Sequence, residues 1–269
     1  MNSTISCTYI GHATTLIKWG ETKIITDLHL GKRVIISPRR MPLPIEPGSL
    51  PELSTILISH THCDHLNISS YKYISCGVPI IVPEGCERAV GRYLSNPVIE
   101  LSHFARHELA DGTEITAVPV IHSSSHFIPT YRTRSNAYIV KKPGSDGSVY
   151  FCGDSGYGSH FAETGNLGRI DLAILPIGSY CPRWYMRRLH MTPAEAVTAF
   201  EDLRAAHMIP IHYGTFRLSL ENPEAPLRWL GKILEERPDL ALKVHPLTPG
   251  ETRTFDIRPL SSEHREQVA

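Results

Sequence analysis

Four short apolar runs in this chain each end in a histidine or an aspartate. "STILISH" leads into His60, and "ITAVPVIH", "SVYFCGD" and "HMIPIH" end at His122, Asp154 and His212. Runs of this length, rich in β-branched residues, favour buried β-strands. In α/β proteins, ligands bind at the carboxyl ends of such strands. The repeated pattern therefore predicts a binding site assembled from four distant parts of the sequence.

The segment "HTHCDH", residues 60–65, is the densest part of this pattern. Its residues His60, His62, Asp64 and His65 offer the imidazoles and the carboxylate that Zn, Mn or Fe prefer. Four such groups are more than one metal can use from one loop, so we infer two metals. A metal pair needs at least three more ligands, and the other three strand ends supply candidates. Taken singly, His122 is equally compatible with a core histidine, Asp154 with a turn aspartate and His212 with a residue that makes a hydrogen bond at a strand end.

Strand and helix patterns alternate along the rest of the chain. Helices are predicted at 84–94, from Thr192 through "TPAEAVTAFEDLRAA", and at 224–237. The predicted strands cover residues 6–10, 14–19, 23–27, 55–59, 79–82, 114–121, 136–142, 148–152, 171–177, 208–212 and 242–244. This mixture predicts an α/β or α+β protein with helices outside sheets. We expect one domain over 1–269, with a flexible tail at 261–269 and a proline-rich loop at 37–51 that serves as a lid or binding loop.

Composition restricts the partners of the chain. The 27 Lys and Arg residues balance 27 Asp and Glu residues, so we expect no nucleic-acid partner. The first 20 residues lack the features of a signal peptide, and no apolar run reaches the ~18 residues that a membrane helix needs. We therefore expect a cytoplasmic protein without a membrane span, with peripheral membrane contact and oligomeric state left open. The six cysteines contain no C-x-x-C pair and indicate no structural zinc site.

The order of the motifs resembles the metallo-β-lactamase fold superfamily of hydrolases. In both, H-x-H-x-D-H is followed by a lone His, then G-D-[ST]-G, then a late His. Between Tyr9 and Phe216 the chain is also similar to the branch of N-acyl-phosphatidylethanolamine phospholipase D and its bacterial relatives. The segments specific to that branch are "GHAT", "IGSYCPRW" and "IHYGTF". The resemblance implies an αββα sandwich with a metal site at the edge of the two sheets.

The resemblance also implies a ligand set for two divalent ions, usually Zn, with Mn or Fe in related branches. One ion would be bound by His60, His62 and His122, the other by Asp64, His65 and His212, with Asp154 bridging them. A hydroxide between the ions is the implied nucleophile, and either Asp64 or Asp154 is expected to orient it or take its proton.

Three further residues match supporting positions of the branch. His190 is expected to contact substrate or protonate the leaving group, and a position in an exposed loop is the alternative. Asp27 is expected to orient a ligand histidine, and His12 occupies a comparable place. For both of these, a buried structural hydrogen bond is the alternative.

The implied activity is that of a phosphodiesterase acting on small or lipid-like phosphodiesters. A lactonase of the sugar-phosphate type is the main alternative, and a nuclease or a non-enzymatic member is a third. Four basic pairs in predicted loops suit a phosphate or carboxylate, and an apolar wall in the proline-rich loop suits a lipid tail. The pairs are Lys32 with Arg33, Arg39 with Arg40, Arg132 with Arg134, and Arg187 with Arg188; the wall is Met41, Leu43 and Ile45. The chain departs from the branch at "DLHLGKR", Cys63 and Leu189, so the acyl-chain pocket of the mammalian enzyme is not implied.

Overall fold

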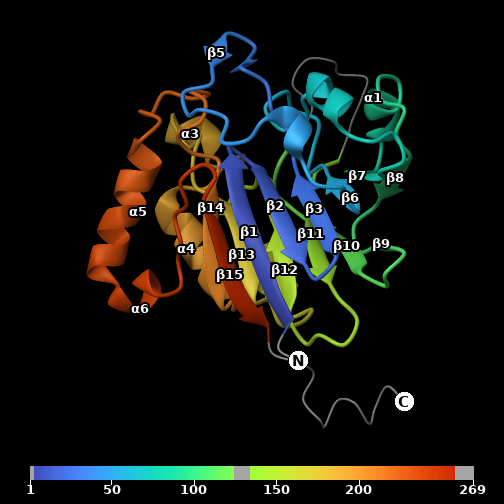
Figure 1. The fold of residues 1–269 in the computed structure, drawn as a ribbon. Helices are drawn as coiled ribbons and strands as arrows, with labels where there is room; N and C mark the ends of the chain where they lie inside the picture. The colour runs from blue at the N-terminus through green and yellow to red at the C-terminus, as the bar shows by residue number, and fades with distance from the viewer. Residues whose placement is uncertain (1–2, 124–133, 258–269) are drawn as a thin grey trace.

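Two β-sheets packed face to face form the centre of the molecule (Figure 1). The computed structural model describes residues 3–123 and 134–257. The first sheet has the order β15-β1-β2-β3-β6-β7-β8 and the second the order β14-β13-β12-β11-β10-β9. The strands of the first sheet are β1 (Ser3–Gly11), β2 (Thr14–Trp19), β3 (Thr22–Thr26), β6 (Thr55–Leu57), β7 (Ile80–Pro83), β8 (Val98–Leu101) and β15 (Thr252–Ile257). Those of the second are β9 (Arg106–Glu108), β10 (Glu114–Pro119), β11 (Asn136–Lys141), β12 (Ser148–Phe151), β13 (Leu172–Pro176) and β14 (His207–Ile211).

The directions of the strands determine at which edge of the sheets the apolar runs end. In the first sheet, β3, β6, β7 and β8 are parallel, and β1 runs the same way because two antiparallel pairings separate it from β3. In the second sheet, β12, β13 and β14 are parallel, and β10 shares their direction for the same reason. The chain therefore leaves each sheet repeatedly at one edge, where α/β proteins place ligands.

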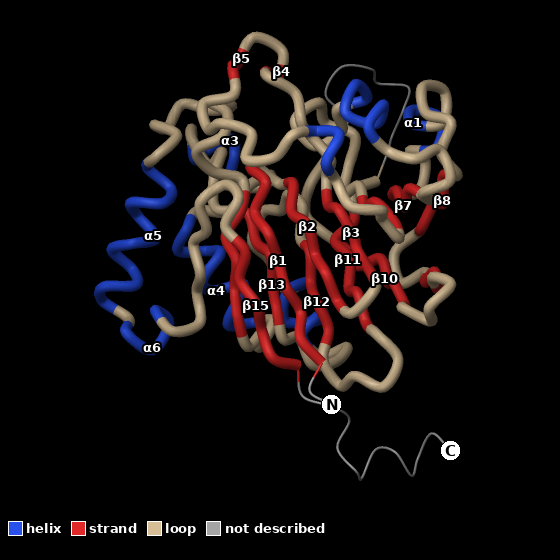
Figure 2. Tube along the Cα trace, viewed as in Figure 1, coloured by secondary structure: helices blue, strands red, loops and turns tan. Residues whose placement is uncertain are grey.

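Helices cover the outer face of the second sheet, and helices and loops cover part of the outer face of the first (Figure 2 shows the helices in blue). On the second sheet, α4 (Pro193–Asp202) packs on β13 and α5 (Ala225–Glu236) packs on α4. On the first sheet, the 3-10 helix η2 (Ile68–Tyr73) and α1 (Glu87–Val90) join a second apolar cluster. The remaining elements are α2 (His160–Gly165), α3 (Arg183–Met186), α6 (Pro238–Ala241), η1 (Pro47–Ser49) and a small hairpin of β4 (Arg33–Val34) and β5 (Ser37–Pro38).

The main core lies between the sheets. It contains alternating residues of both inner faces, such as Ile17 and Tyr138, and extends under α4 through Phe200. The predicted α/β class with helices outside sheets is therefore confirmed. No helix in the described ranges is long and apolar enough to cross a membrane. The expectation of one domain over 1–269 stays a prediction, and the tail at 261–269 falls outside the described residues.

Two predicted elements differ from the structure. Residues 242–244 form no strand; only Val244 makes a bridge, to Met208 of β14. Met208 exchanges both backbone hydrogen bonds with Lys243 and His245, but the next residue of β14 on that side is Pro210, which has no N–H to extend the ladder. The helix predicted at 84–94 is reduced to the single turn of α1 between Gly85, whose φ is +84°, and Gly91.

Candidate metal centre

The four strand ends meet at one edge of the sandwich. His60 follows β6 of the first sheet, while His122, Asp154 and His212 follow β10, β12 and β14 of the second. The seven residues predicted as ligands fall into groups whose donor atoms lie within 4.8 Å of one another. Most of their side chains are buried. Segments more than 150 residues apart in the sequence thus form one cluster, as the strand pattern predicts.

The first group consists of His60, His62 and His122. The Nδ1 atom of His62 lies 2.9 Å from Nε2 of His60 and 3.2 Å from Nε2 of His122. Nδ1–H of His122 donates to the carbonyl oxygen of Leu189 at 2.9 Å, which leaves a lone pair on its Nε2. A ring nitrogen fixed in this way is typical of metal-binding histidines.

A serine fixes the second ring of this group in the same way. The hydroxyl of Ser59 donates to Asp27 Oδ2 at 2.6 Å, so it can only accept from Nδ1–H of His60, 2.9 Å away. Nε2 of His60 therefore also carries a lone pair toward the group.

The second group consists of Asp64, His65, His212 and His12. Asp64 Oδ2 lies 3.3 Å from Nε2 of both His65 and His212, and 2.9 Å from Nε2 of His12. Burial and the neighbouring His212 lower the pKa of His12 to about 3, so its ring is neutral and Nε2–H donates to Asp64. His12 thus holds the carboxylate of Asp64, a supporting contact of the kind expected for it.

Asp27 lies beneath this second group. Its carboxylate accepts from Ser59 N at 2.7 Å, from the Ser59 hydroxyl and from Nδ1–H of His65 at 2.6 Å. Nε2 of His65 therefore faces the other carboxylates. Burial opposes charge on His65, but Asp154, Asp64 and Asp27 outweigh it and raise its pKa well above the usual range. A divalent cation bound among these carboxylates would displace that proton.

Asp154 lies between the two groups. Its Oδ2 is 3.1 Å from His65 Nε2, 3.9 Å from His60 Nε2 and 4.0 Å from His122 Nε2, and its Oδ1 is 3.3 Å from His212 Nε2. Within the described residues, no contact to either oxygen has the geometry of a hydrogen bond. Burial would raise the pKa of Asp154, but His212, His65 and His190 outweigh it and hold the pKa well below its usual range. A buried, ionised carboxylate of this kind requires a cationic partner.

His190 is buried at the same cluster, so the alternative of an exposed loop position is wrong. Its Nδ1 lies 3.6 Å from Asp154 Oδ2, and its ring centroid is 5.3 Å from that of His122. The segment between β13 and α4 folds back over the strand ends, and the guanidinium of Arg183 donates to the carbonyl of His190 at 2.9 Å. Burial lowers the pKa of His190 well below its usual value.

The backbone is strained where it delivers these side chains. His12, Asp27 and His212 have φ angles of +58°, +34° and +62°, a region that side-chain-bearing residues rarely adopt. Such conformations cost on the order of 1–3 kcal/mol each and cluster at functional sites. Gly153 has a φ of +64° as well, and a Cβ there would also lie 2.2 Å from that of Ser59.

Ser59 and Leu189 were not identified from the sequence. Ser59 connects Asp27 to the metal-binding loop, and a small polar residue between an apolar strand and H-x-H is a usable signal for this role. Leu189 contributes its backbone carbonyl oxygen. Because every residue has one, the residue type gives no signal for this role.

The basic pairs occupy different environments. Lys32, Arg33, Arg40, Arg187 and Arg188 are exposed, and Arg134 pairs with Glu84 at 3.2 Å. Arg132 falls outside the described residues. Arg39 is half-buried: it donates to the carbonyls of Gly31 and His29 and stacks 5.0 Å from the ring centroid of Phe216. Because the Phe216 ring contacts His12 edge-on, Arg39 lies beside the metal-binding cluster.

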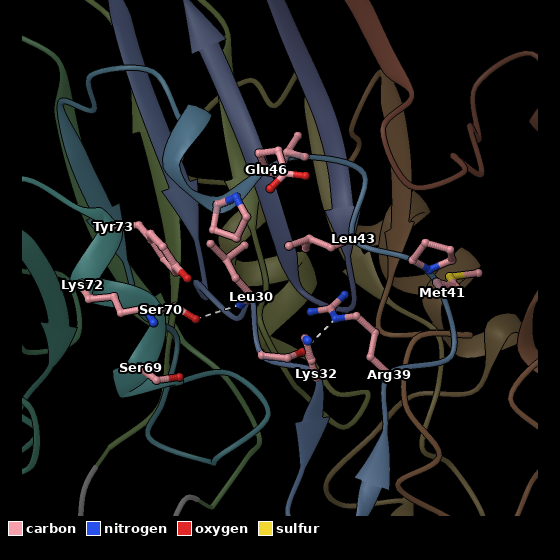
Figure 3. Close-up of a pocket in the computed structure, with 14 residues that line it drawn as sticks. Leu30, Lys32, Arg39, Met41, Leu43, Glu46, Ser69, Ser70, Lys72 and Tyr73 are labelled. Carbon is pink, nitrogen blue, oxygen red and sulfur yellow. Dashed lines mark hydrogen bonds between the residues drawn. The ribbon is translucent and has the colours of Figure 1, made fainter.

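An open pocket of about 620 Å³ lies on the other side of Arg39 (Figure 3). Met41, Leu43 and Ile45 of the proline-rich loop line it, as do Leu30 and Tyr73. The three residues predicted as an apolar wall therefore line one cavity, together with Lys32 and Lys72.

The donor set fits divalent transition metals. Imidazole nitrogens and carboxylates form four overlapping groups, of which His60, His62 and His122 are one and His12, Asp64, His65 and His212 another; the oxygens of Asp154 lie near both of these. Zn, Mn and Fe bind such mixed nitrogen and oxygen sites. The ordered contacts behind the ligands, from Asp27, Ser59 and the Leu189 carbonyl, are those that metal sites require.

The sequence and the fold both match known proteins. A family model described as "Beta-lactamase superfamily domain" matches residues 22–213. The chain is 33% identical over 259 residues to "N-acyl-phosphatidylethanolamine-hydrolyzing phospholipase D 1" of Caenorhabditis elegans, which covers 88% of this chain and 72% of that protein. It is 27% identical over 255 residues to a protein named a metal-dependent hydrolase from Caldivirga maquilingensis, covering 90% of this chain and 99% of that protein.

A solved structure shares the fold. It is titled as Igni18, a novel metallo hydrolase from Ignicoccus hospitalis, and it superposes with a TM-score of 0.71. The sequence identity is 24%, over 95% of this chain and 100% of that one. At this level of identity the match bears on the fold alone.

Proposed function

Because this chain is a metal-dependent hydrolase of the β-lactamase superfamily, we propose that it cleaves lipid-like phosphodiesters at a two-metal centre. The observation that carries the proposal is Asp154, a buried carboxylate with nitrogens of both histidine groups 3.1–4.0 Å from its oxygens. A residue in that position suits a bridging ligand between two ions.

The proposed ligands follow the two groups. His60, His62 and His122 would hold one ion, and Asp64, His65 and His212 the other, and the ion proposed for both is zinc. When bound, such a pair makes hydroxide available near neutral pH and stabilises the attacking and leaving oxygens. Other residues of the chain orient the proposed ligands: Asp27 fixes the ring of His65, and His12 fixes the carboxylate of Asp64.

Three residues are proposed for direct roles in the reaction. Asp154 and Asp64 both lie where a carboxylate could orient the attacking hydroxide or take its proton. His190 is buried beside Asp154 and His122, so its ring faces the place where the substrate reacts. We assign His190 to substrate contact or to protonation of the leaving oxygen.

The substrate class rests on the pocket beside Arg39. Its apolar lining from the proline-rich loop suits a hydrocarbon chain, while Lys32, Arg39 and Lys72 suit an anionic group. The nematode relative is named for hydrolysis of an N-acyl phosphatidylethanolamine, which combines these two chemical features.

Metal analysis tests the centre. Purified protein is expected to carry close to two divalent ions per chain, and a fully active protein with at most one ion would contradict the two-metal proposal.

A parallel assay tests the bond that is cleaved. Bis(p-nitrophenyl) phosphate, N-acyl phosphatidylethanolamine and a panel of lactones should be compared under the same conditions. We expect turnover of the two phosphodiesters. Turnover of lactones alone would replace the proposal with the lactonase alternative.

A further inference from the structure

The connection between β13 and α4 makes a tight turn at Leu189 and His190. It contains the short helix α3, which lies at the end of the molecule opposite to the chain termini (Figure 1). After α3 the backbone reverses, because the N–H groups of Leu189 and His190 both donate to the carbonyl of Met186 at 2.8 Å. Met191 then enters the main core, where it is fully buried. The Leu189–His190 turn is thus held between a surface helix and a core residue.

The two residues of this turn contact the candidate metal centre through different groups. The Leu189 carbonyl accepts from Nδ1–H of His122 at 2.9 Å, and the ring of His190 places its Nδ1 3.6 Å from Asp154 Oδ2. The same connection packs closely on the loop that carries Asp154, since a Cβ at Gly156 would lie 2.9 Å from one of its backbone carbons. The position of the turn therefore affects a proposed ligand and a residue proposed to act on substrate.

The carbonyl of His190 is held by Arg183. His190 lies two residues before the N-cap of α4, so its carbonyl oxygen takes no part in the hydrogen-bond pattern of that helix. Because the residue is buried, this oxygen needs another donor. Nη1 of Arg183 supplies it at 2.9 Å. Arg183 is the first residue of α3, so this bond closes residues 183–190 into a ring.

The other end of the Arg183 guanidinium is fixed by Glu195. Nη2 of Arg183 pairs with Glu195 Oε1, while Oε2 accepts from Thr192 N at 2.8 Å and from the Thr192 hydroxyl at 3.0 Å. Glu195 belongs to the first turn of α4, which packs on β13 of the second sheet. Arg183 therefore connects the Leu189–His190 turn to a fixed helix. A planar group that donates to two acceptors in fixed directions is specific to arginine.

Stability alone does not account for this arrangement. The side chains of Arg183 and Glu195 are 37% and 30% exposed, and ion pairs in such places contribute little to the free energy of folding. The start of α4 is already capped by Thr192. The ion pair adds a fixed direction for the guanidinium, and through it a fixed position for the His190 carbonyl.

We propose that Arg183 and Glu195 form a positioning pair, which holds the Leu189–His190 turn against the candidate metal centre. The pair acts through the Leu189 carbonyl, which orients the ring of His122, and through the ring of His190. A shift of about 1 Å in a reacting group can lower a rate about a hundredfold. The inference rests on the proposed function where it concerns His190, whereas the effect on His122 can be measured without turnover.

A double-mutant cycle tests the action through His190. Hydrolysis of bis(p-nitrophenyl) phosphate is compared for Arg183→Gln, for His190→Gln and for the double variant. Arg183→Gln should lower kcat/KM about tenfold in the original chain and less than about twofold once His190 is replaced. A residue that only stabilised the fold would give losses that multiply in the double variant, and that result would overturn the proposal.

Glu195→Gln tests the second member of the pair. The amide can still complete the capping box of α4, so this substitution mainly removes the charge that faces Arg183. It should lower kcat/KM as Arg183→Gln does, and the two together should cost no more than either alone. Unchanged kcat/KM in Glu195→Gln would show that Arg183 does not depend on this ion pair, and would overturn the proposal.

Metal retention tests the action through His122. The metal-loaded protein is titrated with a chelating dye, and release of the two ions is followed. Arg183→Gln should weaken one ion about tenfold, the one bound through His122, and the other less than about twofold. Equal retention by this variant and the original chain would overturn the proposal. If the original chain does not hydrolyse the phosphodiester, the proposed function fails, and metal retention still decides the positioning of His122.

Arg237→Gln is the matched control. Arg237 is 46% exposed and also pairs with an acidic residue of α4, Glu201 at 3.0 Å, but at the other end of that helix. Its replacement should leave kcat/KM and the retention of both ions unchanged. Losses as large as those of Arg183→Gln would mean that any ion pair on α4 has this effect, and the proposal would be wrong.

Discussion

Hydrogen bonds to the ring nitrogens that point away from the candidate metal centre fix three of its histidines. Nδ1–H of His65 donates to Asp27, that of His60 to Ser59 and that of His122 to the Leu189 carbonyl. Each bond fixes the tautomer and leaves Nε2 free to bind a metal. At the scale of single residues, the centre therefore depends on groups that would not touch an ion as much as on those that would.

Asp154→Asn tests the bridging position. The amide keeps the shape of the side chain but removes the negative charge between the two histidine groups. We expect turnover to fall by about a hundredfold to a thousandfold and both ions to be lost together on dialysis. Kinetic assay and metal analysis of the same samples check this. Asp256→Asn, exposed on β15, is the control, and activity of Asp154→Asn near that of the control would show that the bridging ligand is misassigned.

Asp27→Asn tests the supporting contact. The carboxylate accepts three hydrogen bonds, whereas an amide has only one acceptor oxygen and directs a donor at a group that also donates. Metal affinity should fall about 10- to 100-fold. Competition with a chelator dye measures it, and circular dichroism shows whether the variant is folded at the temperature used. Unchanged affinity in folded protein would limit Asp27 to a structural role.

At the scale of elements, the start of α4 is defined by local hydrogen bonds. Thr192 Oγ1 accepts from Glu195 N at 3.2 Å, and Glu195 Oε2 accepts from Thr192 N at 2.8 Å. The helix start predicted at Thr192 is confirmed, and in the structure it takes the form of a capping box. It also anchors the end of the segment that places His190 in the centre.

Thr192→Ala removes half of that capping box. The free energy of unfolding should decrease by about 1 kcal/mol, because the N–H of Glu195 loses its acceptor. Urea denaturation measures the change. Thr192→Ser, which keeps the hydroxyl, should restore most of it, and equal losses in the two variants would mean that the methyl group matters more than the cap.

The strands of the sandwich differ in how well the sequence predicts them. The strands β6, β10, β12 and β14 end the four short apolar runs of the sequence, and their ends predicted the position of the site. The strand β15 was missed because its first three residues, in "TRTFDI", are exposed and it lies at the edge of its sheet. The strand predicted at 242–244 failed because pairing there depends on Pro210, which is distant in sequence.

At the scale of the whole molecule, buried neutral histidines link stability to pH. His160 is 7% exposed, its Nε2 lies 3.1 Å from Ser155 Oγ, and burial lowers its pKa to about 4. In the unfolded chain the value is near 6.5. Below pH 6.5 the unfolded chain therefore binds a proton that the folded chain does not, and stability falls as pH decreases toward about 4.

His160→Gln should remove this contribution. The decrease in the free energy of unfolding between pH 6.5 and 4 should be smaller than in the original chain, by up to about 3 kcal/mol. Denaturation at a series of pH values provides the comparison. Parallel curves for the two proteins would show that His160 is protonated equally in the folded and unfolded states.

Contacts between segments that are distant in the sequence could not be predicted for this chain. The candidate ligand residues could be predicted because His60, His122, Asp154 and His212 lie within three residues of a strand end and the other three lie in the loop after β6, so local pattern and spatial position coincide. The burial of His190, by contrast, results from a loop that folds over the strand ends, and the pocket beside Arg39 forms between the proline-rich loop and η2. No local pattern encodes such contacts between separate segments.

Both histidine groups combine residues from the two sheets. His60 and His62 come from the first sheet and His122 from the second, just as Asp64 and His65 come from the first and His212 from the second. Neither sheet on its own can assemble a complete coordination sphere. A metal bound by either group would therefore stabilise only chains in which the two sheets have already packed together.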